Sequence, residues 1–545
     1  MAQDPIAAIR GDLAARRFRS ARKKAQIGKK KFPRDPAFPA LAAQALASDG
    51  DHGGAAQEFA QALRLDPGNL NLRCDLAMAL IMSDRMEKAE TVLQGVTEGS
   101  PATARAYYMR AMIATRRADF RTAVAEANAA LEAAPKMTEA LNLRGIAFSE
   151  LRRPETAISD FRKVLALQPA NLRARENLAD RLAEVGRFDE AIEEYRTLVR
   201  LDPAHGHALF RLSQLSDRES LGGLRDSVTA ALKAGPRDPN HEALLHMAAG
   251  TLHARAGDDA EAIRHLDRAH TLDAKSRPWA GARARDGFTH MARLFGSPPD
   301  PGASRPGPRP IFVVGMPRSG STLVEMILTA SGAVASCGEL VTAERLYRDL
   351  VRPADRLTPE LIDRYANEYL AALPDLPKDA VAFVDKMPAN FAHLGVLLTA
   401  FPEARAIDIR RDPRDVAASM WMQRFTSEGM AYASDLRRIG EAANAYHRYM
   451  TLWGEHFPDR ILKLAYEDLV RDLDPATRRL AQFCGIDWTP AMLAPEANAA
   501  TVKTASLGQV REKVHARSIG RWSILGDRIR ELTDALDPEL WPDLS

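Results

Sequence analysis

The C-terminal part of the chain contains the stretch Ile311-Phe-Val-Val-Gly-Met-Pro-Arg-Ser-Gly-Ser-Thr322, which carries its clearest structural pattern. This stretch begins with a short apolar run typical of a buried strand, and an apolar helical stretch, Leu323–Leu328, follows it. Gly315 and Gly320 let the backbone between them wrap around an anion. The start of the helix adds N–H groups and a favourable dipole. The stretch therefore predicts a strand, a phosphate-binding loop and a helix.

The loop differs from that of nucleoside triphosphatases. Their pattern has a lysine directly after the second glycine, whereas this loop has Ser321 there and carries its cation at Arg318. Without that lysine, the β- and γ-phosphates of a triphosphate would be poorly neutralised. The loop suits a smaller terminal anion, and on its own it would also suit a plain tight turn between strand and helix.

A second anion site is predicted after a strand at Ala406–Ile409. Arg411 leaves the tip of that strand, and Ser419 follows eight residues later in the early turns of the next helix. Both side chains can therefore reach one anion. A third short apolar run at Ala382–Val384, with helical stretches between the runs, predicts an α/β domain with a parallel sheet.

Together these elements resemble the sulfotransferase family. Pro317–Thr322 resembles the family's loop for the 5′-phosphosulfate of 3′-phosphoadenosine 5′-phosphosulfate (PAPS). Arg411 and Ser419 resemble the pair that holds the 3′-phosphate. The resemblance implies PAPS as the sulfuryl donor. Arg and Lys side chains can do what magnesium does in kinases, so no metal is expected.

Further motifs resemble the tyrosylprotein sulfotransferases. Cys337-Gly-Glu339 resembles the segment that carries their catalytic base, and Asp385-Lys-Met-Pro388 resembles the segment whose lysine assists the leaving group. Tyr466-Glu-Asp-Leu469 resembles their late-strand element. Ser506-Leu-Gly-Gln-Val510 and Ser518-Ile-Gly-Arg-Trp522 resemble the loop that closes over PAPS. The resemblance assigns catalysis to Glu339, Lys386, Arg318 and Ser506, and PAPS binding to Arg318, Ser319, Gly320, Ser321, Thr322, Arg411, Ser419, Tyr466, Gln509, Val510, Ser518 and Arg521.

Two departures from the tyrosine enzymes leave the acceptor open. Met387 stands where an acidic residue often follows the lysine, and Arg521 stands where the eukaryotic enzymes carry lysine. Both preserve the chemistry that the site needs.

The N-terminal part repeats every 34 residues. Prolines occur at 33, 67, 101, 135, 169 and 203, and alanines at 21, 55, 89, 123, 157 and 191. A third column of small residues occupies 43, 77, 111, 145 and 179. Small residues suit close crossings of paired helices, and proline suits the end of the second helix. The pattern resembles tetratricopeptide (TPR) repeats from about residue 2 to 205, and degenerate or capping units follow.

The predicted fold is an all-α TPR solenoid followed by a P-loop-like α/β domain. The predicted domains are TPR-like repeats at 1–280, a helix end and Pro/Gly-rich linker at 281–309, and the sulfotransferase domain at 310–545. Residues 298–310 hold six prolines and two glycines, so neither helix nor strand is expected to cross them. TPR repeats joined to such a domain are a familiar bacterial arrangement.

Composition narrows the function classes. Among 545 residues, 75 Lys and Arg against 72 Asp and Glu give a net charge of +3, which argues against a general nucleic-acid binder. The basic run Lys23–Lys31 is interpreted as a solvated helix face. No long apolar run or secretory signal is apparent, and three separated cysteines form neither a disulfide framework nor a zinc site. A cytoplasmic protein without membrane insertion is expected.

A metal site is also not predicted. His241 and His246 lie five residues apart, one too many for the zinc motif H-E-x-x-H, so they face different sides of a helix.

Three functions remain open. The first is a PAPS-dependent sulfotransferase that acts on a hydroxyl, possibly a protein or peptide tyrosine, with a protein partner in the TPR groove. The second is transfer to a carbohydrate or small metabolite, with the repeats serving assembly. The third is a TPR interaction protein whose second domain binds nucleotide without turnover. The repeats could equally be a spacer or dimerisation surface, and the oligomeric state is open.

Overall fold

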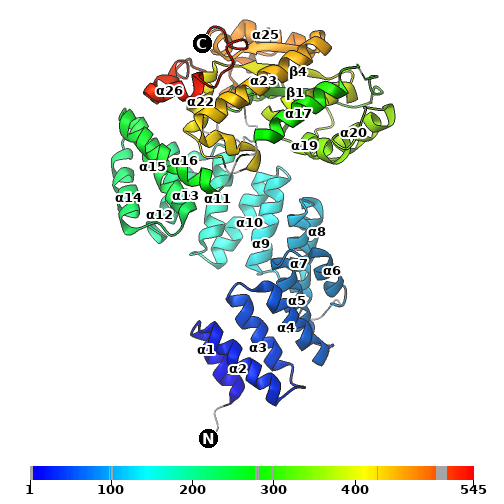
Figure 1. Cartoon of the computed structure of the whole chain (residues 1–545), viewed down its shortest axis with the longest axis vertical. Helices are drawn as coiled ribbons and strands as arrows, with labels where there is room; N and C mark the ends of the chain where they lie inside the picture. Colours follow the sequence, from blue (N-terminus) through cyan, green and yellow to red (C-terminus); the bar gives the residue numbers. More distant parts are fainter. Residues whose placement is uncertain are drawn as a thin grey trace. The chain divides into compact units, whose positions relative to one another are not determined.

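The computed structural model describes residues 4–96, 99, 102–276, 279, 281–297, 299–425, 427–498 and 512–544. The chain forms two compact units, Met1–Arg181 and Leu182–Ser545. The described part of the first unit consists of helices, and the second combines helices with a five-stranded parallel sheet (Figure 1). The predicted fold class, helical repeats followed by an α/β domain, is confirmed.

The first unit is a succession of helix pairs, each joined by a short turn. The helices are α1 (Pro5–Ala14), α2 (Phe18–Lys31), α3 (Ala37–Ser48), α4 (His52–Leu65), α5 (Leu70–Met82), α6 (Met86–Leu93), α7 (Thr103–Arg116), α8 (Phe120–Ala133), α9 (Thr138–Glu150) and α10 (Pro154–Leu167), and α11 (Leu172–Glu184) crosses the boundary of the units. Pro33, Pro67, Pro135 and Pro169 each lie two residues beyond the second helix of a pair, as the repeat predicts. Pro101 lies outside the described residues.

The small-residue columns are the close crossings of these pairs. Every alanine of the 21-to-191 column has no exposed surface, and the same holds for the alanines at 43, 77, 111 and 179. At Gly145 a β-carbon would lie 2.7 Å from Cε1 of Phe161. The backbones therefore approach too closely for larger side chains at these positions.

The turn inside each pair repeats a conformation that the sequence analysis did not predict. Positive φ angles recur every 34 residues, at Arg16, Gly50, Asp84, Ala118, Arg152 and Gly186. The next residue donates its N–H to a carbonyl five positions back, as in Arg153 to Phe148 at 2.8 Å and Asp119 to Ala114 at 2.9 Å. This is the hydrogen bond of a Schellman helix end, and it closes each first helix in the same way.

The second unit begins with further helical pairs. They are α12 (Phe188–Leu201), α13 (Gly206–Leu215), α14 (Leu221–Ala234), α15 (Pro239–Ala256) and α16 (Asp259–Ser276), followed by α17 (Gly281–Leu294). A β-carbon at Gly250 would lie 2.7 Å from Cγ of Leu266, and Ala262 has no exposed surface. Helices α15 and α16 are therefore a closely crossed pair, like the pairs of the repeats.

The sheet has strand order β2-β3-β1-β4-β5, and all pairs are parallel. The strands are β1 (Arg309–Gly315), β2 (Val334–Gly338), β3 (Ala382–Asp385), β4 (Arg405–Arg410) and β5 (Ile461–Ala465). Within the register, Val313 of β1 pairs with Ile407 of β4, and Ile311 pairs with Val384 of β3. The chain builds β1, β2 and β3 on one side and then crosses to β4 and β5, so the order reverses between β1 and β4.

Helices cover both faces of the sheet (Figure 1). Ile311 and Val313 pack into a helix-covered core on one face, whereas Phe312 and Val314 pack into a second core on the opposite face. The α-helices of this region are α18 (Ser321–Thr329), α19 (Thr342–Leu346), α20 (Pro359–Ala371), α21 (Leu394–Ala400), α22 (Pro413–Trp421), α23 (Leu436–His456), α24 (Tyr466–Arg471), α25 (Leu473–Cys484) and α26 (Ile529–Thr533). Shorter helical turns lie at Tyr347–Val351, Pro388–Ala392, Glu428–Ser434, Pro458–Arg460, Pro490–Leu493, Pro495–Ala497 and Arg521–Arg528.

No strand or helix crosses the described linker residues 299–308, but β1 begins slightly before the predicted end of the segment. The strand β1 begins at Arg309 and includes Pro310, so a strand does enter the Pro/Gly-rich segment. Pro310 pairs with Phe383 of β3, while pairing with β4 starts only at Ile311. The proline therefore lies where the central strand still has one hydrogen-bonding neighbour, which is where a missing N–H is tolerated.

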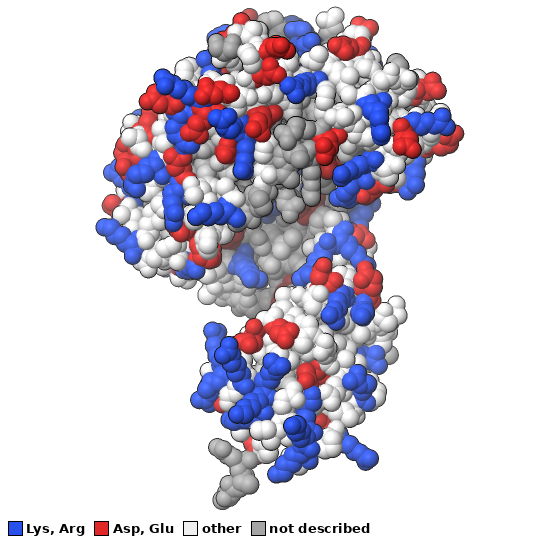
Figure 2. Space-filling view, in the orientation of Figure 1, with Lys and Arg blue, Asp and Glu red and all other residues white. Residues whose placement is uncertain are grey.

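The basic run at Lys23–Lys31 lies on α2, whose buried residues are Ala21, Ala25 and Gly28. Figure 2 shows Lys and Arg side chains gathered over the N-terminal helices on one face. Lys29 pairs with Glu58 at 2.6 Å, and the other lysines of the run are exposed. These contacts agree with a solvated helix face.

Two further findings concern the cysteines and membrane-spanning helices. The three cysteines, Cys74, Cys337 and Cys484, are buried and are not joined in disulfides. Across the part of the chain that the structure describes, no helix combines the length and apolar character needed to cross a bilayer.

Candidate active site

Four of the predicted site residues follow directly on the ends of strands. Glu339 follows β2, Lys386 follows β3, Arg411 follows β4 and Tyr466 follows β5. The predicted phosphate loop follows β1, the central strand. Because all five strands are parallel, these residues meet at one edge of the sheet, where open α/β sheets hold their ligands.

The loop between β1 and α18 is a strained turn closed by a helix start. Arg318 has a φ of 69° and Gly320 a φ of 110°, both left-handed. The Ser319 N–H donates to the carbonyl of Met316 at 3.1 Å. Such conformations cost free energy and persist where the surrounding structure enforces them, often at binding sites.

The hydroxyl groups of this loop fit an anion. Ser319, Ser321 and Thr322 have 1%, 5% and 5% of their surface exposed. Among the described residues, Ser319 Oγ has no hydrogen-bond partner, although it is buried. A buried hydroxyl beside the N–H groups of a helix start is a donor set for phosphate or sulfate oxygens.

Gly320 is required by two independent constraints. Its φ of 110° disfavours any L side chain, and a β-carbon would lie 2.5 Å from Cδ2 of Tyr466. We expect Gly320→Ala to lower the free energy of unfolding by about 1–3 kcal/mol and to weaken anion binding, because the loop and the Tyr466 ring must both shift. Urea unfolding and phosphate titration of the variant measure the two effects. A variant as stable as the wild type would contradict this account of the loop.

Arg318, Arg411 and Ser419 are brought together where the strand order reverses. Arg318 Nε donates to Ser419 Oγ at 3.0 Å, and an Arg411 terminal nitrogen donates to the Arg318 carbonyl at 3.0 Å. The Arg411 guanidinium lies 4.6 Å from the centre of the Tyr466 ring. Burial, and then the charge of Arg411, lower the pKa of Arg318 to about 10. Two adjacent guanidinium groups make an electropositive centre for an anion.

A small cavity adjoins this cluster. It has a volume of about 10 Å³ and is lined by Ser319, Arg411, Tyr446 and Trp541 among others. Arg411 Nε is buried and has no hydrogen-bond partner among the described residues. The cavity therefore has room for about one water molecule between polar atoms that need partners.

The C-terminal segment around Trp522 is held on α22 by Asp415. The Asp415 carboxylate, 1% exposed, accepts from the Gly520 N–H at 2.8 Å and from the Trp522 N–H at 3.0 Å. An Arg411 terminal nitrogen donates to the Ser518 carbonyl at 2.6 Å. Ser518 thus joins the cluster through its backbone.

Of the other residues predicted in the loop that closes over PAPS, the structure describes only Arg521. Arg521 is exposed, and its charge contributes to lowering the pKa of Arg318. Ser506, Gln509 and Val510 lie outside the described residues. The sequence analysis did not identify Asp415. Its partners lie more than a hundred residues away, so no local pattern identifies it.

A buried lysine and a half-exposed glutamate form the second part of the site. Lys386 is 1% exposed, and its ammonium group contacts Glu339 Oε1 directly. The Glu339 side chain is 38% exposed. The Lys386 N–H donates to the Gly338 carbonyl at 2.7 Å, which fixes β3 beside the end of β2. The pair offers an accessible proton acceptor next to a fixed cation.

Asp385 holds the turn that carries Glu339. Its buried carboxylate accepts from Tyr369 Oη at 2.6 Å, from Asn390 Nδ2 at 2.8 Å and from the Leu340 N–H at 3.3 Å. Burial raises the pKa of Asp385 to about 7, although these hydrogen bonds oppose the shift. The carboxylate thereby ties the residue after Glu339 to the end of β3.

A group of potential metal ligands lies elsewhere, on α15 and α16. His253, Glu261 and His265 each offer one ligand atom, all within 4.8 Å of one another. A terminal nitrogen of Arg264 lies 2.5 Å from Glu261 Oε2 and 3.3 Å from His265 Nε2. The Arg264 guanidinium thus supplies the positive charge of this group.

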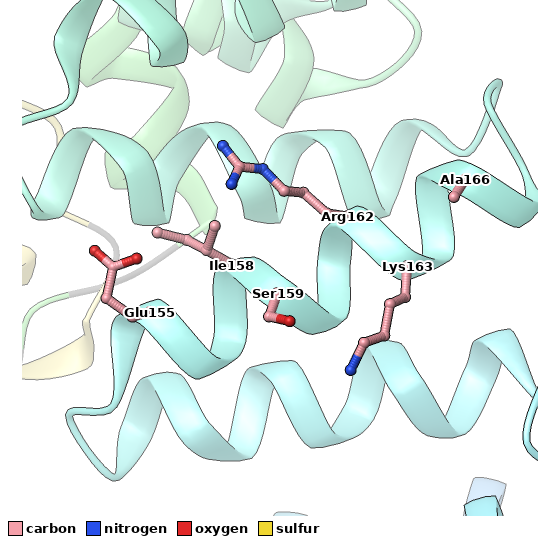
Figure 3. Close-up of a pocket in the computed structure, with 6 residues that line it drawn as sticks. All are labelled: Glu155, Ile158, Ser159, Arg162, Lys163 and Ala166. Atoms are coloured by element: carbon pink, nitrogen blue, oxygen red, sulfur yellow. The ribbon is translucent and has the colours of Figure 1, made fainter.

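A surface depression of about 490 Å³ lies on α10 in the first unit. Figure 3 shows its lining on one helix, with Arg162 and Lys163 pointing away from each other. Lys163 also pairs with Asp160 at 3.3 Å. Since its charged groups do not converge, the depression offers no site comparable to the sheet edge.

Comparison with known proteins agrees with both parts of the chain. Residues 310–490 match the family model described as sulfotransferase family. Two tetratricopeptide repeat models match residues 46–113 and residues 6–69, 108–171, 142–206 and 176–239.

Individual relatives cover only part of the chain. An uncharacterized protein of Aquifex aeolicus (strain VF5) is 33% identical over 237 residues, which are 41% of this chain and 31% of that protein. Protein-tyrosine sulfotransferase 1 of Danio rerio is 26% identical over 235 residues, which are 39% of this chain and 65% of that protein. The chain thus spans between about a third and two thirds of the length of these curated relatives.

Among solved structures, the sulfotransferase domain from the Synechococcus PCC 7002 olefin synthase is 22% identical, with a TM-score of 0.31. The match covers 42% of this chain and 90% of that domain. On the family models and the sheet-edge geometry, the chain joins tetratricopeptide repeats to a domain of the sulfotransferase family.

Proposed function

We propose that the protein transfers the sulfuryl group of PAPS to an acceptor hydroxyl, and that the acceptor is a tyrosine of a protein or peptide. The observation that carries the proposal is the meeting of two kinds of site at one sheet edge. An anion centre of Arg318, Arg411 and Ser419 lies after β1 and β4, and the Lys386–Glu339 pair lies after β3 and β2. Donor binding and proton removal both need such groups.

Two groups of residues would bind the two anionic ends of PAPS. Arg411 and Ser419 would hold the 3′-phosphate, and the loop from Arg318 to Thr322 would hold the 5′-phosphosulfate. The buried, unpartnered Ser319 Oγ and Arg411 Nε support this fit, because both are donors without partners among the described residues. Tyr466 supports the position of the Arg411 guanidinium with its ring.

Glu339 acts as the general base. Its carboxylate accepts the proton of the acceptor hydroxyl as the acceptor oxygen forms its bond to sulfur, and the bond from sulfur to the 5′-phosphate oxygen breaks. Lys386 and Arg318 stabilise the charge that develops on that phosphate. Both are fixed cations with little access to water, which strengthens their effect.

Tyrosine as the acceptor is supported by the relatives. Proteins named protein-tyrosine sulfotransferase from Danio rerio, Drosophila melanogaster and Caenorhabditis elegans match at 23% to 26% identity. The exposed Glu339 carboxylate fits an acceptor that approaches from solvent. TPR repeats generally bind proteins, so we propose that the helical repeats engage the protein acceptor or its carrier.

Calorimetric titration with 3′-phosphoadenosine 5′-phosphate (PAP) and with its 3′-dephosphorylated analogue tests the donor site. We expect Arg411→Ala to weaken PAP binding by about 10- to 100-fold, because a charge-assisted hydrogen bond to the 3′-phosphate is lost. The affinity for the dephosphorylated analogue should change little.

Arg471→Ala, at an exposed position of α24, is the matched control and should bind both nucleotides normally. An equal loss for both nucleotides in Arg411→Ala would mean that Arg411 supports the loop and does not read the 3′-phosphate. If the wild-type protein bound neither nucleotide, the donor assignment would be wrong.

A further inference from the structure

Glu325 is a buried carboxylate beside the predicted catalytic lysine. It lies on α18, within the apolar stretch Leu323–Leu328, and its side chain is 8% exposed. Glu325 Oε1 accepts from Ser336 Oγ of β2 at 2.6 Å, and Oε2 lies 3.9 Å from Lys386 Nζ. A charged residue inside a buried helix face costs free energy unless it is paired, so its place calls for an explanation.

Lys386 therefore lies between two carboxylates of different character. Glu339 is in direct contact and is 38% exposed, whereas Glu325 is more distant and is almost fully buried. An acceptor that approaches from solvent can reach Glu339. Glu325 is shielded, and Ser336 holds its carboxylate still.

In the proposed reaction, proton transfer changes the charge beside Lys386. When Glu339 accepts the proton of the acceptor hydroxyl, its carboxylate becomes neutral and no longer balances the charge of Lys386. A buried ammonium group without a counter-charge is unfavourable. Glu325 lies outside the path of the proton, because Ser336 and Lys386 surround its carboxylate and the acceptor reaches Glu339.

We propose that Glu325 is a positioning residue, a permanent counter-ion that keeps Lys386 charged and aimed at the leaving phosphate while Glu339 is protonated. This inference rests on the proposed sulfuryl transfer. At 3.9 Å Glu325 supplies a second negative charge near Lys386, while the direct contact of the ammonium group is with Glu339. Ser336 Oγ serves as the clamp that fixes the carboxylate at that separation.

A purely structural role for Glu325 makes a different prediction. In that case the Ser336–Glu325 hydrogen bond would only join α18 to β2, and its loss would lower stability without acting through Lys386. A double-mutant cycle separates the two roles, because it measures whether the effect of one change depends on the other residue.

The cycle uses Glu325→Gln, Lys386→Met and the double variant in the full chain, with PAP affinity measured by calorimetry. We expect each single variant to bind PAP about tenfold more weakly, and Glu325→Gln to add nothing further once Lys386 is replaced. In turnover, Glu325→Gln should lower kcat by about 10- to 100-fold with little change in the KM of the acceptor. Glu325→Asp keeps the charge and should recover part of the loss.

Two further variants distinguish a specific role of Glu325 from poor folding of the variant protein. Glu368→Gln makes the same chemical change on α20, at a residue that pairs with Arg364, and should leave PAP affinity and kcat unchanged. Ser336→Ala keeps both charges but releases the clamp, and it should lower kcat less than Glu325→Gln does. It therefore provides a second test if Glu325→Gln is poorly folded.

The outcomes separate this inference from the proposed function. If the wild type binds PAP and transfers sulfate while Glu325→Gln behaves like Glu368→Gln, the role of Glu325 is wrong and sulfuryl transfer stands. If Glu325→Gln weakens PAP binding equally with and without Lys386, the residue acts on the fold alone. If the wild type neither binds PAP nor transfers sulfate, both proposals fall.

Discussion

Replacing Glu339 by glutamine should lower kcat for sulfuryl transfer by about 10²- to 10⁴-fold, because the acceptor hydroxyl loses the group that takes its proton. Glutamine has nearly the same size, and its amide oxygen can still accept a hydrogen bond from Lys386. The geometry of the strand ends should therefore survive. Initial rates with PAPS and a tyrosine peptide, together with PAP affinity by calorimetry, measure the effect.

A nearby glutamate provides the control. Glu344 lies on α19 five residues later, pairs with His393 at 2.8 Å and has a 67% exposed side chain. Glu344→Gln makes the same change in the same region and should leave kcat within about threefold. Full activity in Glu339→Gln would exclude it as the base. Loss of PAP binding in the same variant would show instead that the nucleotide site had been disturbed.

The helical repeats could be predicted closely from sequence because their constraint is local and recurs. The alanines of the 34-residue columns lie at close helix crossings, where only small side chains fit. The left-handed turn residues recur with the same period, but their conformation could not be predicted from residue type. They include Arg16, Asp84 and Ala118 as well as glycines. There the conformation is imposed by the Schellman hydrogen bond, not by residue type.

The sheet was predicted in part. The three strands with clear apolar runs were identified, and β1 extends one or two residues beyond the run at each end, as in the inclusion of Pro310. The strand Val334-Ala-Ser-Cys-Gly338 was missed, since small residues dominate it and it is a short edge strand. The strand β5 was implied only through the motif at Tyr466.

The site could be predicted where residues lie in motifs and not where partners are distant in sequence. Arg318, Arg411 and Ser419 were identified from two motifs about ninety residues apart, and the structure brings them into contact. Glu325 and Asp415 were missed because their partners come from other strands and from the C-terminal segment. Their burial, the only signal of their role, is a property of the fold.

The second unit also shows why the repeats next to the sheet belong with the enzyme domain. Arg424, which follows α22, pairs with Asp273 of α16 at 2.7 Å, and the two side chains are 8% and 4% exposed. His270 Nε2 lies 2.6 Å from the Trp421 carbonyl. The helix α22 carries Ser419, so the same helix joins the anion centre to the helical repeats.

A chain that begins at Ser304 should therefore fail to fold stably, whereas one that begins at Gly186 should remain folded and bind PAP. The shorter chain lacks Phe295, which is 1% exposed and packs edge-to-face on Trp453 at 4.9 Å, and it lacks the partners of Trp421 and Arg424. Losing one partner of a buried ion pair alone costs about 3–5 kcal/mol, a large share of the stability of a typical domain.

Circular dichroism, thermal unfolding and PAP titration of the two chains measure this difference. Asp273→Asn in the full chain removes only the counter-charge of Arg424, so it should lower the unfolding temperature without altering the residues that bind PAP. Arg448→Ala, whose partner Asp537 lies at 2.8 Å with half of the arginine exposed, is the matched surface pair and should have little effect. If the chain from Ser304 were as stable as the chain from Gly186 and bound PAP equally well, α12 to α17 would be an accessory to the sheet domain. In that case the sheet domain would fold and bind PAP without the core that joins α16 to α22, and the prediction would be wrong.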